Sequence, residues 1–175
     1  MPPSFTGLTG EEKYAKLAAG VFDTYMTGIY YRNVPIDLNH GHQQTLVGMS
    51  SFEVIHEDIL YDIVPLYDFL YDYLNTRHTD KMDIYAGAFK KWADNIIANG
   101  VPHNNWNLMQ ARYVMNIGMI LENNKQYADG KGREYYIDYV LNRSSYPPME
   151  SEQISPIMAS IRRQVSGPNV PDTAM

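Results

Sequence analysis

Apolar residues recur every three or four positions along most of this sequence, and that spacing is the strongest constraint on its fold. The first such segment follows residues 9–12, where a threonine and a glutamate have the spacing of a helix capping box. The apolar positions that share one helical face are Tyr14, Leu17, Ala18, Val21, Phe22, Tyr25 and Ile29. This face predicts a helix to about Tyr31, which ends before Pro35 because proline disfavours helical geometry in the preceding residue.

Four more segments have helical spacing, and none alternates polar and apolar residues as a strand does. They cover residues 46–74, 84–97, 106–121 and 135–141. Pro65 lies inside the first and predicts a kink or two consecutive helices. Gly118 lowers helix propensity and is expected to permit close packing of its helix. We therefore expect an all-α fold of antiparallel helical hairpins, each of roughly forty residues.

The helical segments and the end of the chain differ in character. Residues 1–145 carry the apolar faces and predict one helical domain with a sizeable core. The sequence Tyr146-Pro147-Pro148 breaks the last helix. Residues 146–175 are therefore expected to form a proline-rich tail with at most one short helix.

Composition and charge exclude several classes of site and partner. The 175-residue chain has no cysteine, which excludes disulfides, thiolate metal sites and a cysteine nucleophile. Its formal net charge is −6, which argues against nucleic acid and anionic membrane surfaces as partners. The N-terminus has no basic region followed by an apolar one, and no apolar run reaches membrane-spanning length. We expect a soluble chain.

A first concentration of polar side chains lies in residues 36–44, between two helical segments. It includes His40, His42, Gln43 and Gln44. A His-Gly-His pair can bind a metal, but no nearby carboxylate has a spacing that identifies a third ligand. We expect no metal and no cofactor, and consider two roles for this loop. It is either solvated, or it hydrogen-bonds a substrate with His40 or His42 as a base.

A second polar concentration, His103-Asn104-Asn105-Trp106-Asn107, precedes the segment from Trp106 to Leu121. At a helix N-terminus, unpaired backbone N–H groups and the positive end of the macrodipole favour an anionic ligand. Three carboxamides and an aromatic ring would suit an acidic sugar. The alternative is structural, with Asn104 as the N-cap, the other two asparagines in the first turn and Trp106 in the core.

The same segment carries further candidate contacts to a ligand. Tyr113 lies about two helical turns after Trp106 on the same face, and Gln110 lies one turn after it. Trp106, Asn107, Gln110 and Tyr113 are therefore candidate substrate-binding residues.

Paired carboxylates on the second helical segment suggest another chemistry. Four-residue spacing places two pairs on common faces, Asp58 with Asp62 and Asp68 with Asp72. Two carboxylates flanking a bond are the apparatus of glycoside hydrolysis, although a solvated helix face explains the pattern equally well.

The sequence from His103 to Gly118 resembles the helical domain of heparinase II/III-type and alginate-lyase-type polysaccharide lyases. The resemblance continues through Leu121-Glu122-Asn123-Asn124 and residues 127–132 to residues 136–141, and is best over about residues 68–145. It implies part of an (α/α) toroid whose groove binds an acidic polysaccharide. It also implies β-elimination, in which a base removes the C5 proton of a uronate and the glycosidic oxygen leaves C4. A periplasmic or secreted location would accompany such a substrate.

The resemblance also implies roles for individual residues. Asn104 or Asn105 matches the asparagine that neutralises the uronate carboxylate, and Trp106 would stack on a sugar ring. Several alginate lyases carry histidine immediately after the matching Asn-Asn pair, where this chain has Trp106. His103, His40 and His42 are then the candidate bases, and no tyrosine is assigned as the acid.

The resemblance stops near Ser145, whereas such lyases continue with further helices and a β-sandwich domain. We therefore expect a truncated or divergent lyase. The alternatives are a non-catalytic glycan-binding fragment and an (α/α) glycoside hydrolase.

Overall fold

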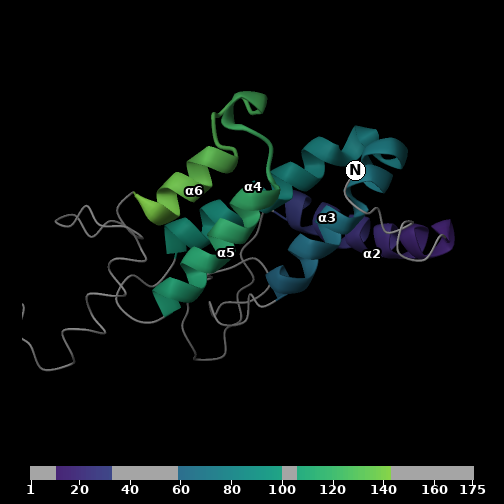
Figure 1. Cartoon of the computed structure of the whole chain (residues 1–175), viewed down its shortest axis with the longest axis horizontal. Coiled ribbons are helices and arrows are strands. Elements are labelled where there is room, and N and C mark those ends of the chain that lie inside the picture. The colour runs from purple at the N-terminus through teal and green to yellow at the C-terminus, as the bar shows by residue number, and fades with distance from the viewer. Residues whose placement is uncertain (1–10, 33–58, 100–105, 143–175) are drawn as a thin grey trace, which may run out of the picture.

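The computed structural model describes residues 11–32, 59–99 and 106–142, and every regular element within them is helical (Figure 1). The expected all-α class is confirmed for these residues. The elements are α2 (Glu12–Tyr31), α3 (Leu60–Arg77), η2 (Thr79–Lys81), α4 (Met82–Asn99), α5 (Trp106–Ile120), η3 (Asn124–Gln126) and α6 (Arg133–Leu141). The tail of residues 146–175 lies outside the described part of the chain.

The helices do not simply pair in sequence order. Helices α3 and α4 are consecutive, yet each packs more extensively on α2 and on α5 than on the other. Helices α5 and α6 do form a packed hairpin, and α6 runs back along α5 in Figure 1. The expected antiparallel hairpin is therefore found at α5–α6. In contrast, α3 and α4 are held together mainly by packing on the same two helices, α2 and α5.

A cluster of aromatic rings forms the core where α2, α3 and α4 meet. The ring of Phe22 lies 5.5 Å from that of Tyr67, 5.2 Å from Tyr85 and 6.3 Å from Phe89, measured between centroids. Trp92 is also fully buried. Aromatic rings bury large apolar areas and pair in offset-stacked or edge-to-face arrangements, so this cluster contributes much of the packing between the three helices.

The predicted apolar face of α2 is partly wrong. The buried residues of α2 are Ala15, Ala19, Phe22, Met26 and Ile29. Leu17 and Val21 are instead 69% and 63% exposed. Apolar residues occupy more than one side of this helix, so periodicity alone did not decide which side packs. The buried side includes two small residues, Ala15 and Ala19.

Helix α3 continues through Pro65 without a break between Leu60 and Arg77. Of the two outcomes predicted at Pro65, division into two helices is therefore wrong within these residues, and the kink stays a prediction. Proline removes one backbone donor from a helix interior. Pro65 is exposed and lies in the second turn of the described helix.

Gly118 confirms the prediction of close helix packing. A Cβ atom at this position would lie 3.1 Å from the Cβ of Tyr136 and 3.3 Å from Cγ1 of Ile137. The α5–α6 connection also includes Gly130, whose φ of +67° is readily adopted only by glycine. Glycine thus suits both the turn at residue 130 and the close contact at residue 118.

Candidate functional site

Most of the predicted site lies outside the described residues. These residues are His40, His42, Gln43, Gln44, His103, Asn104 and Asn105. Trp106 and Asn107 open α5, and only their helical backbone is described. The roles predicted for these residues therefore stay predictions.

Gln110 and Tyr113 are fully buried on α5. The ring of Tyr113 lies 5.3 Å from that of Tyr61 on α3. Residues three apart share a helix face, and here that face packs into the interior. Contact between a substrate and either side chain would require this packing to open, so their predicted substrate-binding role stays a prediction without structural support.

Arg112 lies between these two residues in sequence but is exposed on α5. Its guanidinium carbon lies 3.8 Å from the centroid of the Tyr61 ring. No carboxylate among the described residues forms an ion pair with it. The ring holds the guanidinium by a cation–π contact while its N–H donors remain available to an anion.

Tyr61 supports Arg112 from the first turn of α3. Its hydroxyl oxygen is buried and has no hydrogen-bond partner among the described residues. The sequence did not predict this pair, because the two residues are far apart in the chain and the resemblance that covers Arg112 does not reach Tyr61. The aromatic density of residues 61–73 was the only available signal for Tyr61.

A pocket of about 400 Å³ lies beside Arg112, between α5 and the end of α6. Its other lining residues are apolar: Leu108, Met109, Ala111, Met115 and Val140. A single cation at an apolar pocket can orient a carboxylate, and the planar fork of arginine suits a bidentate contact.

A second, more polar cleft of about 270 Å³ lies at the other end of α5. The tyrosine cleft, as we call it, is lined by Tyr67, Tyr71, Asn75, Met82, Asp83, Ala86, Ile120, Glu122, Gln126 and Tyr127. Since α5 has 15 residues, its ends are roughly 22 Å apart. The cleft is therefore separate from the predicted site.

Hydrogen bonds organise the tyrosine cleft around Glu122. The hydroxyl of Tyr71 donates to Oε1 of Glu122 at 3.0 Å, and the backbone N–H of Glu122 donates to the hydroxyl oxygen of Tyr127 at 3.1 Å. Burial raises the pKa of the Tyr71 hydroxyl, and the hydrogen bond to Glu122 raises it further. Burial also raises the pKa of Tyr127. Both hydroxyls therefore keep their protons to a higher pH than an ordinary tyrosine does.

Two other charged clusters have structural partners on neighbouring elements. Asp23 on α2 accepts hydrogen bonds from Lys81 at 2.6 and 2.8 Å and from Tyr85 at 2.9 Å. Asp94 on α4 accepts from Lys131 at 2.9 Å and from Tyr136 at 3.0 Å. These clusters join α2 to α4, and α4 to the α5–α6 hairpin.

The aspartates considered for glycoside hydrolysis do not line the tyrosine cleft. Asp62, Asp68 and Asp72 are exposed on α3, and Asp58 lies outside the described residues. Among the described residues, no three His, Cys, Asp or Glu side chains are placed to hold a metal ion.

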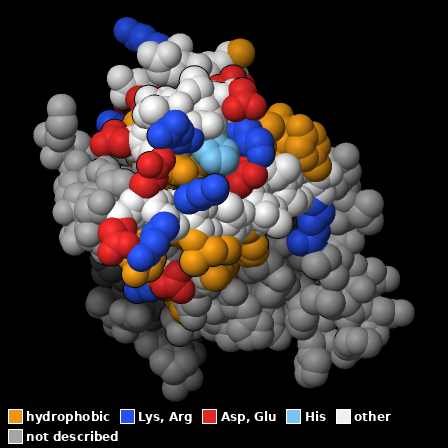
Figure 2. Space-filling view, turned by 90° about the vertical axis from the view of Figure 1, so that its right-hand side faces the viewer, with side chains coloured by type: hydrophobic (Ala, Val, Ile, Leu, Met, Phe, Trp, Pro, Cys, Tyr) orange, Lys and Arg blue, Asp and Glu red, His pale blue; other side chains and the backbone are white. Residues whose placement is uncertain are grey.

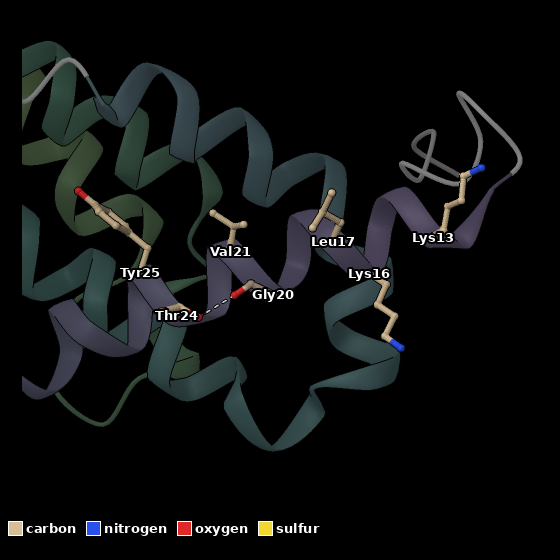
Figure 3. Close-up of a pocket in the computed structure, with 7 residues that line it drawn as sticks. All are labelled: Lys13, Lys16, Leu17, Gly20, Val21, Thr24 and Tyr25. Atoms are coloured by element: carbon tan, nitrogen blue, oxygen red, sulfur yellow. Dashed lines mark hydrogen bonds between the residues drawn. The ribbon is translucent and has the colours of Figure 1, made fainter.

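The outer side of α2 has an open apolar groove of about 720 Å³ (Figure 3). Leu17, Val21 and Tyr25 line it, and the figure shows Lys13 and Lys16 towards one end. On the face drawn in Figure 2, acidic and basic side chains are interspersed, so neither sign dominates the field there. None of the described helices combines the length and apolar character needed to cross a bilayer.

Comparisons with protein-family models, with curated proteins and with solved structures found no match. The resemblance to polysaccharide lyases therefore stays a prediction based on the sequence motifs.

Proposed function

We propose that this chain binds an acidic polysaccharide at the N-terminal half of α5, with Arg112 as a contact to a sugar carboxylate. The observation that supports the proposal is the exposed guanidinium of Arg112, held 3.8 Å from the Tyr61 ring with no ion-pair partner among the described residues. Arginine binds carboxylates through paired N–H donors, and a guanidinium already fixed on a ring loses less freedom on binding.

The residues that precede α5 extend this proposal to lyase chemistry. In the reaction, a base from His103, His40 or His42 takes the C5 proton, and Asn104 or Asn105 neutralises the carboxylate. The C4–O bond then breaks, a C4=C5 double bond forms, and the leaving oxygen takes a proton from an acid. The helices would form part of an (α/α) toroid, and the location would be periplasmic or secreted.

Incubation with heparan sulfate, alginate and chondroitin tests both steps of the proposal. A lyase releases an unsaturated uronate that absorbs ultraviolet light, whereas a non-catalytic fragment binds one of these polymers without that product. Retained binding with no product from any polymer would reject the lyase and favour the binding fragment. Failure to bind any of them would reject the proposal as a whole.

Variants locate the binding site and separate contacts from folding. Arg112→Ala should weaken binding at least about tenfold, because hydrogen bonds to charged groups contribute more than neutral ones. Arg112→Lys should restore it only in part, since lysine lacks the planar fork. Lys125→Ala is the matched control, because it removes an exposed cation on η3, at the other end of α5. Equal losses in Arg112→Ala and Lys125→Ala would indicate non-specific charge attraction.

Asn105→Ala addresses the catalytic step. It should abolish the unsaturated product while leaving the thermal melting temperature unchanged. A large loss of stability would instead support the helix-cap interpretation of the Asn-Asn pair.

A further inference from the structure

The pocket of about 400 Å³ beside Arg112 is apolar apart from that one guanidinium, among the described lining residues. Ala111 and Val140 in its lining are buried, whereas Leu108 is 42% exposed. A sugar ring carries hydroxyl groups around its edge, and a hydroxyl that leaves water without a hydrogen-bond partner costs free energy. The lining therefore suits an apolar group better than it suits a sugar ring.

One side of α5 combines this apolar lining with the positive charge. Leu108, Arg112 and Met115 follow one another at steps of four and three residues, so they share one side of the helix. The guanidinium carbon of Arg112 lies 3.8 Å from the centroid of the Tyr61 ring, and no described carboxylate forms an ion pair with it. A ligand that uses both features must join an anionic group to an apolar one.

We propose that this pocket binds an unbranched alkyl carboxylate of medium length, with its carboxylate on Arg112 and its chain against Leu108 and Met115. The planar fork of arginine can bond both carboxylate oxygens, and a methionine side chain adapts its shape to an alkyl chain. The pocket volume lies within the range typical of sites for small molecules. This inference goes beyond the proposed polysaccharide site and shares only Arg112 with it.

Isothermal titration of the full chain with butanoate, hexanoate and octanoate, each below its micelle concentration, tests the proposal. Each step of two methylene groups should tighten binding about tenfold, because each buried methylene contributes a similar free energy. Octanamide is the uncharged counterpart of octanoate and should bind at least about tenfold more weakly. No binding of octanoate, an affinity that does not rise with chain length, or equal binding of octanamide would overturn the proposal.

The two proposals that use Arg112 can fail independently. Octanoate is titrated without any polysaccharide present. Binding of octanoate with no binding of heparan sulfate, alginate or chondroitin would reject the polysaccharide site alone. Binding of one of these polymers with no binding of octanoate would reject the alkyl carboxylate alone.

Met115→Gln tests whether the alkyl chain occupies the pocket. It keeps a long unbranched side chain of similar helix propensity but introduces an amide into the lining, so it should weaken octanoate binding at least about fivefold. Met119→Gln is the matched control, because Met119 is 61% exposed on the same helix and does not line the pocket. Circular dichroism establishes that both variants are folded, and equal losses in the two would reject the pocket as the site.

Arg112→Gln tests the carboxylate contact at an exposed position, where the substitution removes the charge without disturbing a buried side chain. It should abolish the preference for octanoate over octanamide while keeping the dependence on chain length. A preference for octanoate that survives in this variant would reject Arg112 as the residue that binds the carboxylate.

Discussion

Gly118 and Tyr136 approach so closely that a Cβ atom at Gly118 would lie 3.1 Å from the Cβ of Tyr136. Alanine at residue 118 would therefore force α5 and α6 apart, at a cost of about 1–3 kcal/mol for overpacking. Its better helix propensity returns only about 1 kcal/mol. We expect Gly118→Ala to lower the free energy of unfolding in urea, and Gly118→Val to lower it further.

Gly20 provides the matched control for that substitution. It lies within α2, and a Cβ atom there would meet nothing within 4 Å. Gly20→Ala should therefore raise the free energy of unfolding by about 0.5–1 kcal/mol, since only helix propensity changes. Stabilisation by both alanines would contradict the close contact at Gly118.

The ionised carboxyl of Asp23 should contribute to the free energy of unfolding at neutral pH and lose this contribution in acid. Burial raises the pKa of its carboxyl, but the hydrogen bonds from Lys81 and Tyr85 outweigh that effect, and the pKa lies below its ordinary value of 3.8. A group whose pKa falls on folding stabilises the native state above its unfolded pKa, and this contribution disappears as the pH falls through the folded value. Urea unfolding from pH 7 down to pH 2 should show this loss below about pH 4.

Asp23→Asn should remove that part of the pH dependence. At pH 7 it should cost about 1–3 kcal/mol, because the buried Tyr85 hydroxyl and partly buried Lys81 lose a charged partner. Asp68→Asn, on exposed α3 surface, is the control and should keep the wild-type acid profile. An unchanged profile in Asp23→Asn would show that other carboxyls cause the acid loss.

Asn124 should control the stability of α6. Its side-chain oxygen accepts hydrogen bonds from the backbone N–H groups of Gly132 at 2.8 Å and Tyr135 at 3.0 Å. These groups lie at the N-terminus of α6, where intrahelical acceptors are missing. Asn124→Ala should therefore cost about 0.5–2 kcal/mol, seen as faster hydrogen exchange of the α6 amides.

Aspartate at residue 124 should rescue this helix, because it keeps the acceptor oxygen and adds negative charge near the helix N-terminus. Asn142→Ala is the control at the other end of α6, where the side chain makes an exposed hydrogen bond to Asp138. Equal exchange in Asn124→Ala and the wild type would mean that α6 is held by packing alone.

The exposed side of α2 should tolerate polar residues. Leu17→Ser and Val21→Ser should each change the free energy of unfolding by no more than about 0.5 kcal/mol, as for other exposed positions. Phe22→Ala, in the aromatic core, should cost about 3–5 kcal/mol. Thermal melting compares the three, and a strong loss in either serine variant would mean that another part of the chain covers this side.

Local sequence determined where several helices begin and end. The predicted end near Tyr31 is matched by the end of α2 at Tyr31, and the predicted segment of residues 106–121 is matched by α5. The role of Gly118 in packing could be predicted because an isolated glycine lowers helix propensity and is favoured where another helix approaches closely. Where a helix ends and where a glycine permits close packing depend largely on residues nearby in the chain. A sequence pattern shows those residues directly.

Only the tertiary structure decided which side of each helix is buried and which distant residues meet. It buried Ala15 and Ala19 rather than Leu17 and Val21, and it brought Arg112 onto Tyr61. It also joined Tyr71 to Glu122, which are 51 positions apart, in a cleft that no motif predicted. Periodicity fixes that a helix has an apolar side, but the side that packs and the groups that meet depend on helices from distant parts of the chain.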